Sequence, residues 1–287
     1  MGGVGPGVTS QTSKTWFITG TSRGFGREWA TAALERGDSV AATARDPRTL
    51  DGLVERFGDA VLPLALDVTD RAAVVAAVDA AHERFGRLDV VVNNAGFGQF
   101  GMVEEVGEEQ VRAQLETNLL GALWVTQAAL PHLRAQGSGH VVQVSSIGGV
   151  TAFPTTGAYH ASKWALEGLS QSLAQEVAGF GIRVTIVEPW GYSTDWAGPS
   201  AQHAPEIAAY DGVRAATAEA MGSLASDAGD PTATRAAILA LVDADEPPLR
   251  LFLGDGPLGV VTADYEQRLA TWRAWDDVAV AAHGRRS

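Results

Sequence analysis

The stretch "TGTSRGFG", residues 19–26, places Gly20, Gly24 and Gly26 directly after an apolar run and at the start of a helical pattern. Small residues in such a turn let the backbone approach a phosphate group, and the helix N-terminus supplies amide donors and a positive dipole end. A tight strand-to-helix turn without a ligand would carry the same glycines. Because the turn follows the first apolar run of the chain, the phosphate-binding interpretation is favoured.

Outward from this loop, apolar runs alternate with helical patterns. Seven runs predict strands, at 15–19, 39–44, 60–66, 88–93, 140–146, 182–189 and 249–254. Helical patterns cover about 25–36, 70–85, 108–135 and 157–180. Strands that are apolar on both faces are typical of parallel sheets covered on both sides. We therefore predict an α/β fold, a Rossmann-like doubly wound sheet of about seven parallel strands with helices on both faces, whose carboxyl edge binds the ligand.

The chain has 287 residues, which we expect to divide into a flexible tail at 1–13 and a single domain at 14–287. Within that domain, 191–230 contains a stretch rich in small residues and proline, and we expect a substrate lid there.

Composition excludes several classes of function. A net charge of −13 disfavours nucleic-acid binding, and no apolar run is long enough to span a membrane. There is no cysteine, and the six histidines are scattered, so no metal site is expected. We expect a cytoplasmic protein that binds a small molecule.

Seven short motifs in this order resemble the short-chain dehydrogenase/reductase family, in its short-form, NADP(H)-preferring branch. They are "TGTSRGFG" at 19–26, "LDVT" at 66–69, "NNAG" at 93–96, Asn118 within "LETNLLGA", "VSS" at 144–146, "YHASK" at 159–163 and the imperfect "EPWGYSTDW" at 188–196. The resemblance covers residues 15 to about 195, about two-thirds of the chain.

The resemblance implies roles for the matching positions. The implied catalytic residues are Asn118, Ser146, Tyr159 and Lys163. The implied cofactor-binding residues are Gly20, Arg23, Gly24, Phe25, Gly26, Asp67, Val68, Asn93, Ala95, Gly96, Tyr159, Lys163, Pro189 and Thr194. The family also pairs subunits through helices like those predicted at 108–135 and 157–180, so a homodimer or homotetramer is expected.

Tyr159 and Lys163 lie four residues apart, so a helix places both on one face. A nearby ammonium group and an oxidised nicotinamide favour the phenolate, and we expect them to lower the pKa of Tyr159 by about 2–3 units. In the reducing direction, Tyr159 would protonate the developing alkoxide, while Ser146 would hydrogen-bond the same oxygen. Asn118 would hold a water molecule that links Lys163 to solvent. His160 is expected to have only a surface or packing role.

The end of the second predicted strand bears on the choice of cofactor. Ala44 stands where an acidic residue would bind the adenosine ribose of NAD, and Arg45 follows it. Together with Arg23, Arg45 could bind a 2′-phosphate, which favours NADP(H) over NAD(H). If the strand ended in a shifted register, Asp46 would instead be the acidic residue at the adenosine ribose, which would favour NAD(H).

Trp190 departs from the family pattern, which has glycine after this proline. We expect it to strain the turn, narrow the pocket or form its wall, and so to reshape substrate access. The aromatic residues expected in the substrate pocket are Phe97, Phe153, Trp190, Tyr192 and Trp196. Trp272 and Trp275 are expected in helix packing or in a subunit contact.

These observations favour an NADPH-dependent reductase of ketones or aldehydes that works reversibly. Two alternatives stay open: an NAD-dependent alcohol dehydrogenase on the same fold, and a non-catalytic regulatory protein that senses NADP.

Overall fold

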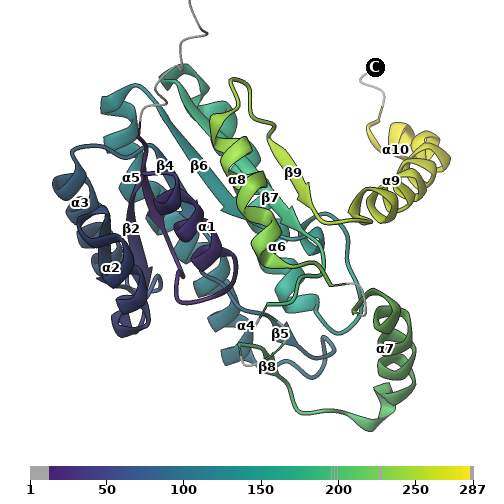
Figure 1. The fold of residues 1–287 in the computed structure, drawn as a ribbon. Helices are drawn as coiled ribbons and strands as arrows, with labels where there is room; N and C mark the ends of the chain where they lie inside the picture. The colour runs from purple at the N-terminus through teal and green to yellow at the C-terminus, as the bar shows by residue number, and fades with distance from the viewer. Residues whose placement is uncertain (1–12, 195, 197, 199, 226–227, 285–287) are drawn as a thin grey trace, which may run out of the picture.

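A parallel sheet of seven strands, in the order β3-β2-β1-β4-β6-β7-β9, forms the centre of the molecule (Figure 1). The computed structural model describes residues 13–194, 196, 198, 200–225 and 228–284. The order reverses between β1 and β4, as in doubly wound sheets that bind ligands at this switch point. The predicted Rossmann-like fold is confirmed.

The seven strands of the sheet match the seven predicted runs within two residues at each end. They are β1 (Thr15–Ile18), β2 (Ser39–Ala44), β3 (Val61–Ala65), β4 (Val90–Asn93), β6 (Gly139–Val144), β7 (Ile182–Pro189) and β9 (Arg250–Leu253). A second, two-stranded parallel sheet pairs β5 (Gln99–Phe100) with β8 (Gln202–His203).

Ten helices occur in the described part of the chain. They are α1 (Gly24–Glu35), α2 (Asp51–Phe57), α3 (Arg71–Phe85), α4 (Glu108–Leu115), α5 (Ala122–Gln136), α6 (Gly157–Val177), α7 (Asp211–Ala225), α8 (Thr234–Asp243), α9 (Pro257–Ala274) and α10 (Asp276–Ala282). The helix predicted at 108–135 is divided into α4 and α5 by a π-helical segment, Glu116–Gly121.

Side chains of each strand alternate between two cores, one on each face of the sheet. In β1, Trp16 and Ile18 pack with residues of α1, α2 and α8, whereas Phe17 packs on the other face with residues of α3, α5 and α6. All three are fully buried. Because both faces are covered, the strands need apolar residues at every position, which explains their continuous apolar sequences.

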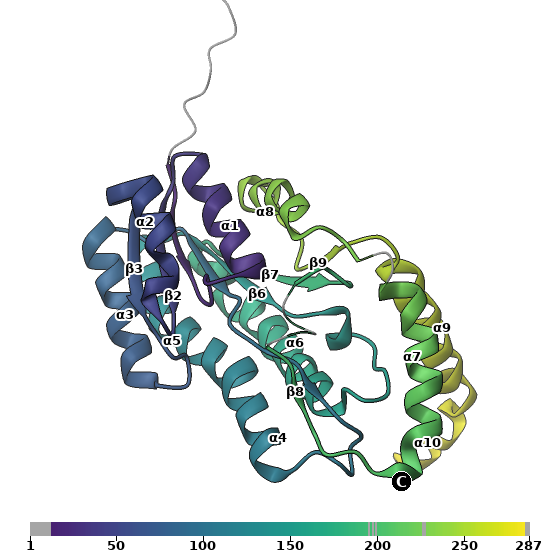
Figure 2. The same cartoon turned by 60° about the horizontal axis from the view of Figure 1, so that its bottom comes forward.

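The carboxyl ends of the strands point to one edge of the sheet, and the segments that follow β4 and β7 extend beyond it. The β5–β8 pair and α7 lie below this edge in Figure 1 and come forward in Figure 2. Backbone bonds from Ser193 N to Gly229 O (2.9 Å) and from Gly229 N to Gly191 O (3.0 Å) hold the two ends of the predicted lid together.

The C-terminal helices α9 and α10 follow the edge strand β9 and lie at the outside of the molecule (Figure 1). Trp272 and Trp275 are 62% and 64% exposed there, so they do not pack within the chain, and the alternative of a subunit contact stays a prediction. The predicted tail at 1–13 lies outside the described residues except for Ser13, whose Oγ donates to Gly37 O (2.9 Å). In the part of the chain that the structure describes, no helix is long and apolar enough to cross a membrane.

Candidate active site

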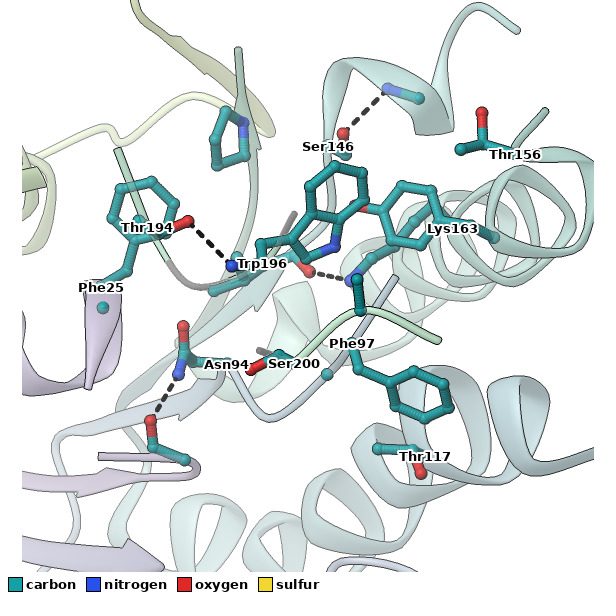
Figure 3. A pocket seen from close by; sticks show the side chains of 18 of the residues that line it. Phe25, Asn94, Phe97, Thr117, Ser146, Thr156, Lys163, Thr194, Trp196 and Ser200 are labelled. Atoms are coloured by element: carbon teal, nitrogen blue, oxygen red, sulfur yellow. Dashed lines mark hydrogen bonds between the residues drawn. The ribbon is translucent and has the colours of Figure 1, made fainter. Parts of the chain in front are cut away.

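A cavity of about 1030 Å³ opens at the carboxyl edge of the sheet, and the loops after β1, β2, β4, β6 and β7 form its walls (Figure 3). Most of the residues predicted for the site line this cavity. They are Gly20, Arg23, Gly24, Phe25, Arg45, Asp67, Val68, Ala95, Gly96, Phe97, Ser146, Phe153, Tyr159, Lys163, Pro189, Trp190, Tyr192, Thr194 and Trp196. Gly26, Asn93 and Asn118 lie just behind the surface of the cavity.

The glycine loop between β1 and α1 needs its glycines for two different reasons. Gly20 and Gly24 have φ values of +70° and +58°, a region that other residues rarely adopt. Gly26 has an ordinary φ, but a Cβ atom there would lie 2.4 Å from Gly20 O and 2.5 Å from Asn94 Nδ2. Gly26 therefore shapes the loop without facing the ligand.

Asn94 fastens this loop to the next wall of the cavity. Its Nδ2 donates to Thr19 O and Gly20 O, both at 2.9 Å (Figure 3). The prediction assigned the ribose wall to Asn93, but the Asn93 side chain turns away and donates to Thr126 Oγ1 (3.0 Å). Asn93 thus supports the sheet, and Asn94, which the sequence analysis did not single out, lines the cavity.

The wall after β2 is formed by Ala44 and Arg45, opposite Asp67. The pKa of Asp67 is lowered, mainly by the hydrogen bond from the Thr69 backbone amide and further by the charge of Arg45. Asp46 does not line the cavity, because it accepts from the Arg48 backbone amide (3.1 Å) and forms an ion pair with its guanidinium (2.8 Å). Asp46 is therefore not one of the residues that line the cavity after β2.

Arg23 extends from the glycine loop toward the lid, and its NH2 donates to Ser200 Oγ (2.5 Å). Arg23 and Arg45 both line the cavity, and Asp67 lines it as well.

Tyr159 and Lys163 lie on the first turns of α6, one turn apart, and both are about 6% exposed. The Lys163 Nζ donates to Val144 O (2.7 Å), at the end of β6, and lies 5.8 Å from the centre of the Tyr159 ring. Ser146 follows the same strand and its Oγ accepts from the Gly148 amide (3.0 Å). The side chains of Ser146, Tyr159 and Lys163 thus line the same cavity.

The expected lowering of the Tyr159 pKa is not present in the chain by itself. Burial raises the pKa of Tyr159 to about 12, although the neighbouring Ser146 hydroxyl acts in the opposite direction. Burial also lowers the pKa of Lys163 to about 8, although Glu167 opposes this shift. The expected lowering considers only the attraction between the two charges. It leaves out the free-energy cost of placing each charge in a buried site, which is the largest cause of both shifts.

Asn118 lies within the π-helical segment, 2% exposed. Its Oδ1 accepts from Phe97 N (3.1 Å), and its Nδ2 donates to Phe97 O (3.0 Å) and Ser162 Oγ (3.3 Å). A Cβ atom at Gly96 would lie 3.1 Å from Asn118 Oδ1, so Gly96 permits this contact. In the described structure, Asn118 holds the loop that follows β4 against α6.

His160 is buried, contrary to the alternative of a surface role, and it joins two loops of the cavity. Its Nδ1 is 2.8 Å from Gly148 O, and its Nε2 accepts from Phe153 N (2.9 Å). These partners assign the proton to Nδ1. Burial lowers the pKa of His160, so the ring is neutral at physiological pH. In the sequence, the feature that draws attention to His160 is its position next to Tyr159.

The aromatic residues predicted for the substrate pocket divide between two ends of the cavity. Trp196 lies 4.9 Å from the Tyr159 ring and 5.3 Å from that of Phe100, centre to centre. Tyr192 instead packs edge-on against Phe25 at 5.0 Å, on the glycine-loop side. Phe97 and Phe153 line the cavity next to Asn118 and His160, respectively.

Trp190 packs against the turn after β9. Its amide donates to Leu253 O (2.9 Å), and a Cβ atom at Gly254 would lie 2.9 Å from Trp190 Cβ. Thr155 is the single non-glycine residue with positive φ in the described chain, so Trp190 does not strain its turn as one of the expectations held. Trp190 forms part of the cavity wall.

The segment after β7 is anchored to the opposite wall by an ion pair. Glu105 Oε1 accepts from Arg214 NH1 (2.6 Å) and Ile207 N (2.7 Å), while its Oε2 accepts from Met102 N (2.7 Å). Arg214, Thr217 and Ala218 of α7 line the cavity. These three residues are not among the predicted site residues, because the sequence predicts a lid but no helix at 211–225.

The cavity fits a dinucleotide in two respects that are visible in the chain. The glycine loop leaves open space, since a Cβ atom at Gly24 would meet nothing closer than 3.9 Å, and it lies at the N-terminus of a 12-residue helix. No group of three or more metal-ligating side chains occurs among the described residues.

Comparison with known proteins identifies the family. Residues 14–205 match the family model of short chain dehydrogenases. The chain is 45% identical to oxidoreductase BOA17 of Botryotinia fuckeliana over 94% of its own length and 99% of that protein.

Solved structures agree with this match. A short-chain dehydrogenase from Streptomyces avermitilis is 40% identical, with a TM-score of 0.86 over 94% of this chain and 98% of that one. An alcohol dehydrogenase from Thermococcus sibiricus, in complex with 5-hydroxy-NADP, is 29% identical, with a TM-score of 0.71 over 84% of this chain and 96% of that one. Similar structures include complexes with NADP-type nucleotides and with NADH. The chain is therefore an oxidoreductase that belongs to the short-chain dehydrogenase family.

Proposed function

We propose that this enzyme is an NADPH-dependent reductase of ketones and aldehydes that works reversibly, with Tyr159 as its acid and base. The observation that supports this most strongly is that Tyr159, Ser146 and Lys163 face the same cavity as the glycine loop. One substrate oxygen can contact the phenol and the Ser146 hydroxyl there, while the rest of the cavity is long enough to hold a dinucleotide.

When bound, the nicotinamide supplies the hydride in reduction and accepts it in oxidation. Tyr159 donates its proton to the carbonyl oxygen as negative charge develops on that oxygen. Ser146 hydrogen-bonds the same oxygen and stabilises this charge. Because burial raises the pKa of Tyr159 to about 12, the phenol is protonated at neutral pH, which is the form that reduction requires.

Oxidation of an alcohol requires the phenolate instead. The Lys163 ammonium group favours that form through charge attraction, and this role requires Lys163 to be protonated. Because the pKa of Lys163 is only about 8, oxidation depends on the groups that surround this amine. Asn118 would orient a water molecule that carries protons toward Lys163.

The preference for NADP(H) over NAD(H) is supported by the wall after β2. Ala44 and Arg45 line the cavity, Arg23 faces them from the glycine loop, and Asp46 is held away by Arg48. A 2′-phosphate would find two guanidinium groups, while no carboxylate of the segment after β2 lines the cavity to accept the ribose hydroxyl protons of NAD.

The test is a panel of ketones and aldehydes, with aromatic and aliphatic members, offered with NADPH and with NADH. The proposal expects turnover with NADPH and a lower kcat/KM with NADH. A higher kcat/KM with NADH would favour the NAD-dependent alcohol dehydrogenase. Tight NADPH binding without turnover of any member would favour the regulatory protein.

Three further expectations belong to this proposal. The segment 191–230 acts as a substrate lid, which is consistent with the α7 side chains at the cavity. The enzyme is a homodimer or homotetramer in the cytoplasm. Its substrate is a small carbonyl compound or alcohol with an apolar or aromatic body, because aromatic side chains surround Tyr159.

A further inference from the structure

Two carboxyl groups lie buried behind the catalytic residues, and the proposed mechanism gives them no role. Glu167 is on α6, one turn after Lys163, and is 5% exposed. Glu188 is on β7, directly before the cavity residue Pro189, and is fully buried. Carboxylates are rarely buried to this extent unless each one is paired.

One guanidinium group faces both carboxyls. Arg250 on β9 places its Nε 3.1 Å from Glu167 Oε2 and 3.4 Å from Glu188 Oε1. Its NH2 donates to Gln171 Oε1 (2.9 Å) rather than to a second carboxylate oxygen. The two acids therefore share this one guanidinium, and the other cation near them is Lys163, one helical turn before Glu167.

Three of the four oxygens of this pair lack a hydrogen bond to the described residues, while Glu167 Oε2 accepts from Arg250 Nε (3.1 Å). In the described structure, Glu167 Oε1 and both oxygens of Glu188 have no hydrogen-bond partner. An ionised carboxylate can only accept, so two ionised groups cannot satisfy each other. One proton between them would provide a donor and would also leave a single negative charge opposite Arg250.

Glu167 lies against the turn that follows Ser146. A Cβ atom at Gly149, in this turn, would lie 3.1 Å from Glu167 Oε1 and closer still to Ser145 Oγ. Lys163 on the same helix is attracted by Glu167, which opposes the lowering of the Lys163 pKa by burial. The groups that face the acid pair are Lys163 and Gln171 from α6, Arg250 from β9 and Ser145 from the end of β6.

We propose that Glu167 and Glu188 share one proton at neutral pH, and that the pair is a positioning element that keeps Lys163 protonated. Glu188 holds the proton, because it is the more deeply buried of the two. Glu167 carries the negative charge, one helical turn from the amine. The effect on catalysis rests on the proposed function, since it acts through the role of Lys163.

The proton of Glu188 also makes the fold sensitive to alkaline pH. Burial and the neighbouring Glu167 raise the pKa of Glu188 to about 8. The folded chain therefore binds a proton that the unfolded chain releases near the ordinary value of 4.5. The stabilisation is complete below about pH 4.5 and is lost as the pH rises to about 8.

The first experiment looks for the shared proton directly and needs no activity. Infrared difference spectra of the wild-type protein are recorded during a pH titration. We expect a carbonyl-stretch band of a protonated carboxylic acid at about pH 7, where ordinary carboxyls are ionised, and its disappearance near pH 8. Glu188→Gln should remove this band. Absence of the band in the wild type, or an unchanged band in Glu188→Gln, would overturn the proposal.

The second experiment measures the pH profile of kcat for three variants in the oxidation of the alcohol that the carbonyl panel yields, because oxidation is the direction that requires Lys163 to be protonated. Glu167→Gln removes the anion beside Lys163, so the alkaline limb should move to lower pH by about one unit or more. Glu188→Gln leaves Glu167 ionised and gives it an amide donor, so the limb should stay in place or move to higher pH. Glu176→Gln, at an exposed position of the same helix, is the control and should match the wild type.

An alkaline limb that stays in place in folded Glu167→Gln would contradict the positioning role. If no substrate is turned over, only the proposed function is in doubt, because the infrared titration and the melting temperature at each pH test the proton by themselves. Across pH 5 to 9, the melting temperature should fall less in Glu188→Gln than in the wild type. An equal fall in both would count against the shared proton.

Discussion

The indole of Trp196 lies against the phenol of Tyr159, with 4.9 Å between the ring centres. Trp196 comes from the segment after β7, so the predicted lid reaches the proposed catalytic residue. Its Nε1 is buried and has no hydrogen-bond partner in the described structure. An aromatic wall with this indole N–H group suits a substrate that has an apolar body and, besides the carbonyl oxygen, a second hydrogen-bond acceptor.

Replacement of Trp196 should therefore change substrate binding more than turnover. Trp196→Ala should raise KM for aromatic ketones by about 2- to 10-fold, which is the strength of one aromatic contact. Trp196→Phe keeps a ring and should recover most of this loss for substrates without a second acceptor. Steady-state kinetics of both variants test this, with exposed Trp272→Ala as the control. An unchanged KM in Trp196→Ala would show that the indole does not contact the substrate.

The choice of nucleotide is expected to depend on Arg45. Arg45→Ala should raise KM for NADPH by about 10- to 100-fold, because charge-assisted hydrogen bonds to a phosphate are lost, and should leave KM for NADH almost unchanged. Arg56→Ala is the matched control, because Arg56 is an exposed arginine that pairs with Glu35 and does not line the cavity. Equal effects of Arg45→Ala on both nucleotides would remove the basis for an NADP preference.

Trp190 is expected to set the size of the substrates that enter. Trp190→Gly removes an indole from the cavity wall, so ketones with larger substituents should show a lower KM, while NADPH binding is retained. The measurement is kcat/KM across a series of ketones of increasing size, together with the Kd of NADPH. If substrate range and kinetics both remain as in the wild type, Trp190 has no part in access.

Glu105 is expected to hold α7 over the cavity. The Ile207 amide, Arg214 and the Met102 amide lower the pKa of Glu105 to about 2. Its contribution to stability is present above the ordinary value of 4.5 and is lost as the pH falls through about 2, so it is complete at neutral pH. Glu105→Gln should speed amide hydrogen exchange in α7 and raise KM, while exchange in the sheet stays the same. Unchanged exchange in α7 would show that other contacts hold the helix.

The sequence predicts the strands of the main sheet well, because a sheet buried on both faces requires continuous apolar runs such as "TWFI" in β1. It predicts α1, α3 and α6, and α4 and α5 as one helix, for a similar reason, but it does not predict α2 or α8, although both contribute to the core. It does not predict α9, whose side chains are mostly exposed and show no apolar face toward the sheet. Nor does it predict α7, which is held by one ion pair between residues more than a hundred positions apart, Glu105 and Arg214.

The candidate site is predicted where a motif fixes both residue and position, as for Tyr159 and Lys163. The sequence could not show that burial would dominate the pKa of Tyr159, because burial depends on the whole fold. Asn93 and Asn94 are a second example: both are asparagines at the end of β4, and the alternation of side chains along the strand turns only one of them into the cavity.

The central claim is that the Tyr159 phenol supplies the proton for carbonyl reduction by NADPH. Its most direct test compares wild type and Tyr159→Phe for two quantities, the Kd of NADPH and the rate of NADPH oxidation with a ketone that the wild type reduces. The account predicts an almost unchanged Kd and a rate lowered by about 100- to 10,000-fold, the usual contribution of acid catalysis. A Tyr159→Phe enzyme that binds NADPH normally and reduces the ketone within a few-fold of the wild-type rate would contradict it.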